Sequence, residues 1–160
     1  MRKHTRLFVL SLCLLAVLLA AVSMAQGFEK TQKYPGTFSD VPENAWFAKE
    51  VQSAYELGFV NGKSDTSFDP NGTMTVAEGI TIASRVHASY NGKTIAEVSG
   101  GKWYDMYIKY AIENGLFEDG YFNSYDRTIR RYEMAVLFAS AVPESYLTAK
   151  NDIKAIPYVN

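Results

Sequence analysis

Two short stretches combine charged residues with the signals of a helix start, and they are the best candidates for chemistry in the sequence. Within residues 74–78, the Thr75 side chain can accept from the backbone N–H of Glu78, whose carboxylate can reach back to Thr75. A second stretch has Glu133 at the matching place but Arg130 where the capping residue should stand, so half of the capping box remains. We therefore expect Thr75, Glu78 and Glu133 to cap helices.

The second helix start also carries a cation, Arg131, directly after Arg130. A cation is unfavourable at the positive end of a helix, which indicates that Arg131 has a purpose such as contact with a ligand. The alternative is an ordinary solvated arginine. The first start has Val76 at the matching position, so we expect such a contact at the second start and not at the first.

No arrangement of residues predicts catalysis, a cofactor or a bound metal. His87 is the only histidine beyond residue 25, and no catalytic triad, phosphate loop or cluster of metal ligands is present. A calcium loop counted back from Glu78 has Gly72 in place, but Ser67 replaces the essential first aspartate. The sequence therefore favours a protein that is not an enzyme.

The first 25 residues have the pattern of a secretory signal peptide. A basic start precedes the largely apolar residues 7–22, and Ser23-Met24-Ala25 is typical of a cleavage site. A retained membrane anchor is the alternative. Cleavage would remove Cys13, the only cysteine, and change the formal net charge from -1 to -4 by taking away three positive charges. Neither charge suggests nucleic-acid binding.

Matching residues recur along the rest of the chain and predict a repeat. Three pairs lie 57 positions apart, namely Trp46 and Trp103, Glu56 and Glu113, and Gly58 and Gly115. The glutamates of the two helix starts lie 55 apart. We predict a polar linker over residues 26–37, helix–loop–helix units over 38–92 and 93–146, and the beginning of a truncated third unit over 147–160.

Apolar spacing places two helices in the first unit. The pattern predicts one helix over residues 45–57 and another from 75 to about 90. Gly58 and Gly92 stand where helix-terminating glycines are expected, and Pro143 should stop the last helix of the second unit.

The ordered set of motifs resembles the S-layer homology (SLH) domain. The set consists of the turn Phe-Ser-Asp-Val-Pro at residues 38–42, a tryptophan-led helix ending in Leu-Gly, a glycine-containing loop and the capped helix start. The resemblance covers about residues 38–142, with a vestige at 151–159. It implies an all-α fold in which helix–loop–helix repeats pack as a pseudo-threefold bundle with grooves between them, incomplete in this chain.

The resemblance also implies a ligand, the secondary cell-wall polysaccharide of Gram-positive-type cell walls, often pyruvylated. A guanidinium fork and helix N-terminal N–H groups suit the pyruvate carboxylate, and the motif's arginine falls on Arg131, beside Arg130. Further candidate glycan contacts are two tryptophans, two carboxylates and two loop glycines: Trp46, Trp103, Asp40, Glu97, Gly62 and Gly120. Each has a structural alternative: the tryptophans could lie in the core, the carboxylates could cap turns, and the glycines could serve turns alone.

The implied function is non-covalent anchoring of a secreted protein at the cell wall or S-layer of a bacterium. No nucleic-acid partner is expected, and no membrane contact after signal cleavage. One alternative is a structural or assembly module that has lost strong glycan binding and pairs with another SLH-containing chain, as Val76 and the truncated third unit suggest. Another is an anchored enzyme whose catalytic part lies elsewhere.

Overall fold

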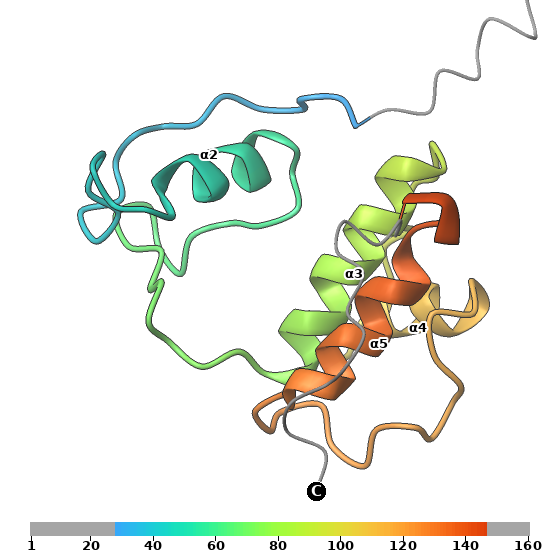
Figure 1. The fold of residues 1–160 in the computed structure, drawn as a ribbon. Helices are drawn as coiled ribbons and strands as arrows, with labels where there is room; N and C mark the ends of the chain where they lie inside the picture. Colours follow the sequence, from blue (N-terminus) through green and yellow to red (C-terminus); the bar gives the residue numbers. More distant parts are fainter. Residues whose placement is uncertain (1–27, 147–160) are drawn as a thin grey trace, which may run out of the picture.

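The computed structural model describes residues 28–146, so the predicted signal peptide and the start of a third unit lie outside the described residues. This part of the chain contains four α-helices and a closing 3-10 turn, which are α2 (Ala48–Glu56), α3 (Val76–Tyr90), α4 (Asp105–Glu113), α5 (Arg131–Ala141) and η1 (Glu144–Tyr146) (Figure 1). Between residues 28 and 146 there are isolated β-bridges but no strand or sheet. The predicted all-α fold is confirmed, and the pseudo-threefold bundle stays a prediction.

The starts of α3 and α5 have the geometry expected from their sequences. In α3, the Glu78 N–H donates to the Thr75 hydroxyl at 3.2 Å, and the Thr75 N–H donates to the Glu78 carboxylate at 2.7 Å. In α5, the Arg130 N–H donates to Glu133 at 2.9 Å. The arginine side chain has no acceptor atom, so it cannot accept a hydrogen bond from the Glu133 N–H. Only half of the capping box therefore forms at the start of α5.

Three of the helices end in the same hydrogen-bonded motif. At the end of α2, the Gly58 N–H donates to the Tyr55 carbonyl at 2.8 Å, and the Phe59 N–H donates to Ala54 at 2.9 Å. This pair of bonds is a Schellman motif, which needs a residue with positive φ. A glycine supplies this residue at the end of each helix. It is Gly58 after α2 (φ +73°), Gly92 after α3 (φ +59°) and Gly115 after α4 (φ +72°).

The helix predicted over residues 45–57 begins later, at Ala48. The preceding residues form consecutive turns, in which the Ala45 N–H donates to Pro42 at 2.9 Å and the Ala48 N–H donates to Ala45 at 3.0 Å. With this correction, α2 and α4 begin and end 57 positions apart, and α3 and α5 begin 55 positions apart. The division into two units stays a prediction.

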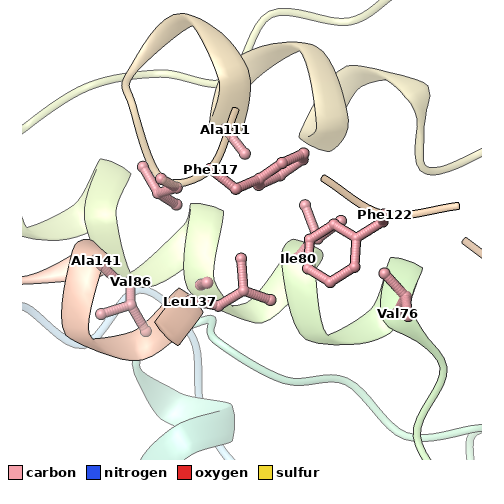
Figure 2. Close-up of a cluster of buried hydrophobic side chains, with 10 residues drawn as sticks. Val76, Ile80, Val86, Ala111, Phe117, Phe122, Leu137 and Ala141 are labelled. Carbon is pink, nitrogen blue, oxygen red and sulfur yellow. The ribbon is translucent and has the colours of Figure 1, made fainter. Parts of the chain in front are cut away.

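The main hydrophobic core forms where α3 packs against both α4 and α5. Figure 2 shows side chains of α3 meeting Ala111 of α4, Leu137 of α5, and Phe117 and Phe122 from the segment between these helices. Gly79 leaves room for the Ile129 side chain just before α5, because a Cβ there would lie 2.7 Å from Ile129 Cδ1. α3 is therefore buried between two helices of the second unit.

α2 belongs to a second, smaller apolar cluster built around Phe38, Val41 and Val51. The loop that follows α2 contributes Phe68, whose ring centroid lies 5.7 Å from that of Phe38. The two helices of the predicted first unit therefore lie in different clusters, as their separation in Figure 1 shows. Helices α4 and α5 of the second unit therefore cover the apolar side chains of α3 that α2 leaves uncovered.

The described part of the predicted linker is mostly exposed, but a few contacts hold it to the rest of the chain. The Phe28 ring lies edge-on to Phe59 with centroids 5.2 Å apart, and the Thr31 N–H donates to the Glu56 carbonyl at 2.8 Å. Aromatic side chains in this polar segment give it apolar area to bury. The segment thus connects the end of α2 with the main core.

The starts of α3 and α5 lie side by side and share backbone hydrogen bonds. The Val76 N–H donates to Arg127 and the Ala77 N–H donates to Tyr125, both at 2.9 Å. In the other direction, the Ile129 N–H donates to the Met74 carbonyl, also at 2.9 Å. Helices α3 and α5 consequently begin at one end and run in the same direction (Figure 1).

An ion pair consolidates the start of α5. The Arg127 guanidinium donates to both oxygens of the Glu133 carboxylate, at 2.6 and 2.8 Å, and only 4% of the Glu133 side chain is exposed. These bonds, together with the Arg130 N–H, lower the pKa of Glu133 to about 2. Glu133 therefore stays ionised in the folded chain over the whole physiological range.

We expect the free energy of unfolding to decrease as the pH falls from about 4.5, the ordinary pKa of glutamate, towards 2. The folded-state pKa of Glu133 is depressed, so its contribution is complete above the unfolded-state pKa and disappears as the folded carboxylate is protonated. Denaturant unfolding at several pH values measures this slope. Glu133→Gln should flatten it and cost about 1–3 kcal/mol at pH 7.

The matched control is Glu113→Gln, because Glu113 is exposed and its closest cation, Lys109, lies 3.9 Å away. This control should leave both the stability and the slope nearly unchanged. An equal slope for the wild type and for Glu133→Gln would contradict the role of the Arg127–Glu133 pair.

Candidate functional site

A groove of about 330 Å³ lies between the loop after α2, the first three turns of α3 and Trp103 of the second unit. Its lining combines aromatic, cationic and carboxylate side chains with backbone of the loop. The charged and aromatic lining residues are Lys63, Phe68, Asp69, Glu78, Arg85 and Trp103. Aromatic rings and charged groups therefore line the same groove.

Arg85 is the cation of this groove that has no carboxylate partner within residues 28–146. Its guanidinium donates to the Tyr107 hydroxyl at 2.9 Å and to the Phe59 carbonyl at 3.4 Å. It also lies 5.2 Å from the centroid of the Tyr107 ring. These neutral contacts hold a partly buried positive charge in place without neutralising it, so an anionic group of a ligand could do so.

Lys63 and Glu78, which also line the groove, neutralise one another. The Lys63 ammonium pairs with one oxygen of Glu78, and the other oxygen accepts from the Thr75 N–H. Burial alone would raise the pKa of Glu78, but the hydrogen bonds from Lys63 and Thr75 outweigh it and lower the pKa. Glu78 is therefore an ionised acceptor at the edge of the groove as well as a cap.

The two candidate tryptophans are both exposed, so neither is a core residue. Trp103 is 60% exposed, lines the groove and packs edge-on to Tyr104 with centroids 5.3 Å apart. Trp46 is 88% exposed and lies outside the groove, against Phe47. The equivalent positions of the two units therefore differ in their surroundings.

Asp40 holds the loop that forms one wall of the groove. Its carboxylate accepts from the N–H groups of Phe68 and Asp69, at 2.9 and 2.7 Å, and from the Ser67 hydroxyl at 2.9 Å. The bonds from Phe68 and Asp69 lower the pKa of Asp40. All of these partners belong to the loop, so Asp40 positions the groove and does not line it.

Glu97, the counterpart of Asp40 in the second unit, is exposed and makes no hydrogen bond or ion pair within residues 28–146. It lines a smaller hollow of about 230 Å³ together with Trp103. Trp103 therefore lines both this hollow and the main groove.

The two candidate glycines have different reasons for being glycine. Gly62 lines the groove, and a Cβ there would lie 2.5 Å from Cε1 of the Phe38 ring. Gly120 has a φ of +80° in a turn closed by the Tyr121 N–H donating to Glu118 at 3.1 Å, and it lies outside the groove. The first glycine leaves room for a ring, whereas the second allows a turn.

The predicted anion contacts at the start of α5 lie outside the groove lining. Arg130 and Arg131 are both exposed, and the backbone N–H groups of Arg131, Tyr132 and Glu133 have no acceptor among residues 28–146. At the start of α3, by contrast, the four first N–H groups are all bonded. An anion could therefore bind N–H groups at the second start but not at the first.

The sequence analysis missed Arg85 and Lys63. Arg85 is the only cation within the apolar run of α3, and that isolation was the available signal. Lys63 has no comparable signal, because its pairing with Glu78 depends on the path of the loop. In the described part, we find no helix suited to crossing a membrane and no cluster of residues suited to holding a metal ion.

A family model described as the S-layer homology domain matches residues 37–78, which extend from the first turn to the capping glutamate of α3. The resemblance noted in the sequence is thus confirmed for this segment. The match ends before the second unit, whose status as a repeat stays a prediction.

Curated relatives share a longer region. An amylopullulanase of Thermoanaerobacterium thermosulfurigenes is 30% identical over 110 residues, which cover 66% of this chain and 6% of the relative. An endo-1,4-beta-xylanase A of Thermoanaerobacterium saccharolyticum is 31% identical over 103 residues, which cover 61% of this chain and 9% of the relative. A cell surface protein of Thermoanaerobacter kivui is 26% identical over 114 residues, which cover 71% of this chain and 14% of the relative. The shared region is therefore a small fraction of each relative. No solved structure gives a significant match.

Gly62→Ala should destabilise the first unit by about 1–3 kcal/mol, because the added methyl group overlaps the Phe38 ring. Thermal or denaturant unfolding measures the effect. The control is Asn61→Ala, since Asn61 is an exposed neighbour on the same loop. If the alanine at position 62 left stability intact and changed only ligand binding, the packing explanation of this glycine would be refuted.

Proposed function

The chain carries an S-layer homology domain at residues 37–78, and from this premise we propose that it attaches a protein to the bacterial cell wall without covalent bonds. The ligand is secondary cell-wall polysaccharide, and the binding site is the groove between the first unit and Trp103. The observation that carries this proposal is the unneutralised Arg85 guanidinium in a groove edged by an exposed tryptophan.

The chemistry of the groove suits an acidic polysaccharide. The exposed Trp103 ring offers an apolar face on which a sugar ring can pack. Arg85 provides a planar fork of donors for a carboxylate, such as a ketal-linked pyruvate. Asp69 and Glu78 can accept hydrogen bonds from sugar hydroxyl groups.

Of the remaining predicted contacts, Arg130 and Arg131 are linked to this groove through the backbone. Arg130 and Arg131 follow Ile129, whose N–H donates to Met74, a residue of the groove lining. A long polymer could therefore extend from the groove towards the start of α5. Within this proposal, Trp46, Asp40, Glu97 and Gly120 do not line the main groove, and Asp40 acts by holding its wall.

The relatives favour attachment over catalysis as the role of this region. Two are named for glycan-degrading enzymes and one for the cell surface. A region of this size that occurs in proteins with such different names is best explained as a module for surface location. We accordingly propose an extracellular protein at the cell wall whose described part is not catalytic.

A second candidate function is assembly with another chain of the same family. The observation that favours it is the apolar surface of α5, where Tyr132 is 55% exposed, Val136 41% and Phe138 37%. This assembly function does not require the groove to bind glycan strongly.

We expect residues 26–160, the form left after the predicted cleavage, to co-sediment with cell-wall sacculi that carry their polysaccharide. Trp103→Ala should weaken this binding about tenfold, which corresponds to about 1.4 kcal/mol. The matched control is Trp46→Ala, because Trp46 is the equivalent exposed tryptophan outside the groove. Circular dichroism establishes that both variants keep their helix content.

Stripping the polysaccharide from the sacculi should abolish sedimentation of the wild type. Arg85→Gln should weaken binding to sacculi with acidic polysaccharide more than to sacculi whose acidic substituent has been removed. Equal binding to stripped and intact sacculi, or equal losses for the two tryptophan variants, would refute the proposed site.

A further inference from the structure

The face of α5 that points away from α3 is apolar and exposed. Glu133, Leu137 and Ala141 form the buried stripe towards the core. The other positions of the helix are mostly small or apolar, and those exposed besides Arg131 are Tyr132, Ala135, Val136, Phe138, Ala139 and Ser140. A helix that is apolar on all sides is normally covered on all sides, so this face is suited to a partner.

The charges at the two ends of this face are opposite to those that the helix dipole favours. Arg131 lies at the positive N-terminal end of α5, and Glu144 lies just beyond its negative C-terminal end. Both residues are exposed, and neither side chain has an oppositely charged partner within residues 28–146. Each charge would be stabilised at the other end of such a helix.

We propose that this face binds a second copy of the same chain, with the two α5 helices antiparallel about a twofold axis. In this arrangement Arg131 of each copy lies beside the partner's Glu144. Each Arg131 then meets the negative end of the partner helix. Each Glu144 meets the positive end, where the N–H groups of Arg131, Tyr132 and Glu133 have no acceptor among the described residues. The face is self-complementary, as a twofold interface requires.

The ion pairs also set how the two helices align. Because α5 ends at Ala141 and Val142 is extended, the pairing of Arg131 with the partner's Glu144 aligns the helices over their full length and not residue by residue. It brings the central turn of one helix, which carries Val136 and Ala139, against the central turn of the other. Two small alanines near the centre, Ala135 and Ala139, let the helix axes approach closely.

This pairing does not depend on the glycan groove, since none of the α5 face residues lines it. It gives Arg131 a protein partner in place of the glycan anion expected from the sequence. The two roles of Arg131 can be told apart by experiment. If Arg131 contacts the glycan, its replacement weakens the binding of a monomer to sacculi. If Arg131 pairs with a second copy, its replacement lowers the mass of the assembly measured without glycan.

Sedimentation velocity of residues 26–160 over a range of concentrations tests the pairing. We expect a monomer–dimer equilibrium that weakens with added salt. Val136→Asp should abolish the dimer, and Arg131→Glu should weaken it about tenfold. Lys49→Glu is the control, because it makes the same charge change at an exposed site on α2. Circular dichroism tests whether each variant keeps its helices.

A charge exchange tests the register. Glu144→Arg alone should weaken the dimer as Arg131→Glu does, and the double variant should restore it. Cross-linking adds an independent measurement, because the only cysteine, Cys13, is absent from residues 26–160. A mixture of Val136→Cys and Ala139→Cys chains should form disulfide-linked dimers on mild oxidation, whereas a Lys49→Cys chain should not.

A monomer at every concentration would overturn the proposal and would indicate that residues 147–160 or another protein covers this face. A dimer that persists in Val136→Asp, or that the charge exchange does not restore, would overturn the antiparallel arrangement. Weaker sacculus binding by an Arg131→Glu monomer, with an unchanged mass profile, would return Arg131 to the glycan site.

Discussion

The backbone contact between the two helix starts is the constraint on which the rest of the structure depends. Hydrogen bonds from Val76 and Ala77 to the segment before α5, and from Ile129 back to Met74, join residues that are about 50 positions apart in sequence. They satisfy N–H groups that a helix start cannot bond internally. As a result, α3 and α5 share one end and one direction, and α3 becomes the central helix of the main core.

The groove follows from this arrangement. Because α3 is held by the second unit, the loop after α2 has to span the distance between two separate apolar clusters. Asp40 fastens that loop through three hydrogen bonds to residues 67–69. The same packing places Trp103 of the second unit beside this loop, where it lines the groove. Neither unit could form this site alone, so the proposed glycan site depends on the contact between units.

Local features were predictable from the sequence, and contacts between distant residues were not. The capping box at Thr75 and the terminating glycines at Gly58 and Gly92 depend on neighbours within a few positions, so their residue types suffice. The role of Arg85 depends on Tyr107 and on the position of the loop, which no local pattern encodes. The contact of Phe28 with Phe59 was not predictable for the same reason, because the two residues are distant in sequence and the segment around Phe28 is polar.

The two helix starts, similar in sequence, provide different surfaces. The start of α3 is closed by a full capping box and by carbonyl groups of the second unit, whereas the start of α5 keeps open N–H groups and exposed arginines. If α5 pairs with a second copy as we propose, each assembly presents two grooves to the same polymer. The second groove then binds at the effective concentration set by the dimer, so modest affinity per groove would suffice for firm attachment. Pairing and glycan binding would thus act together although they use separate surfaces.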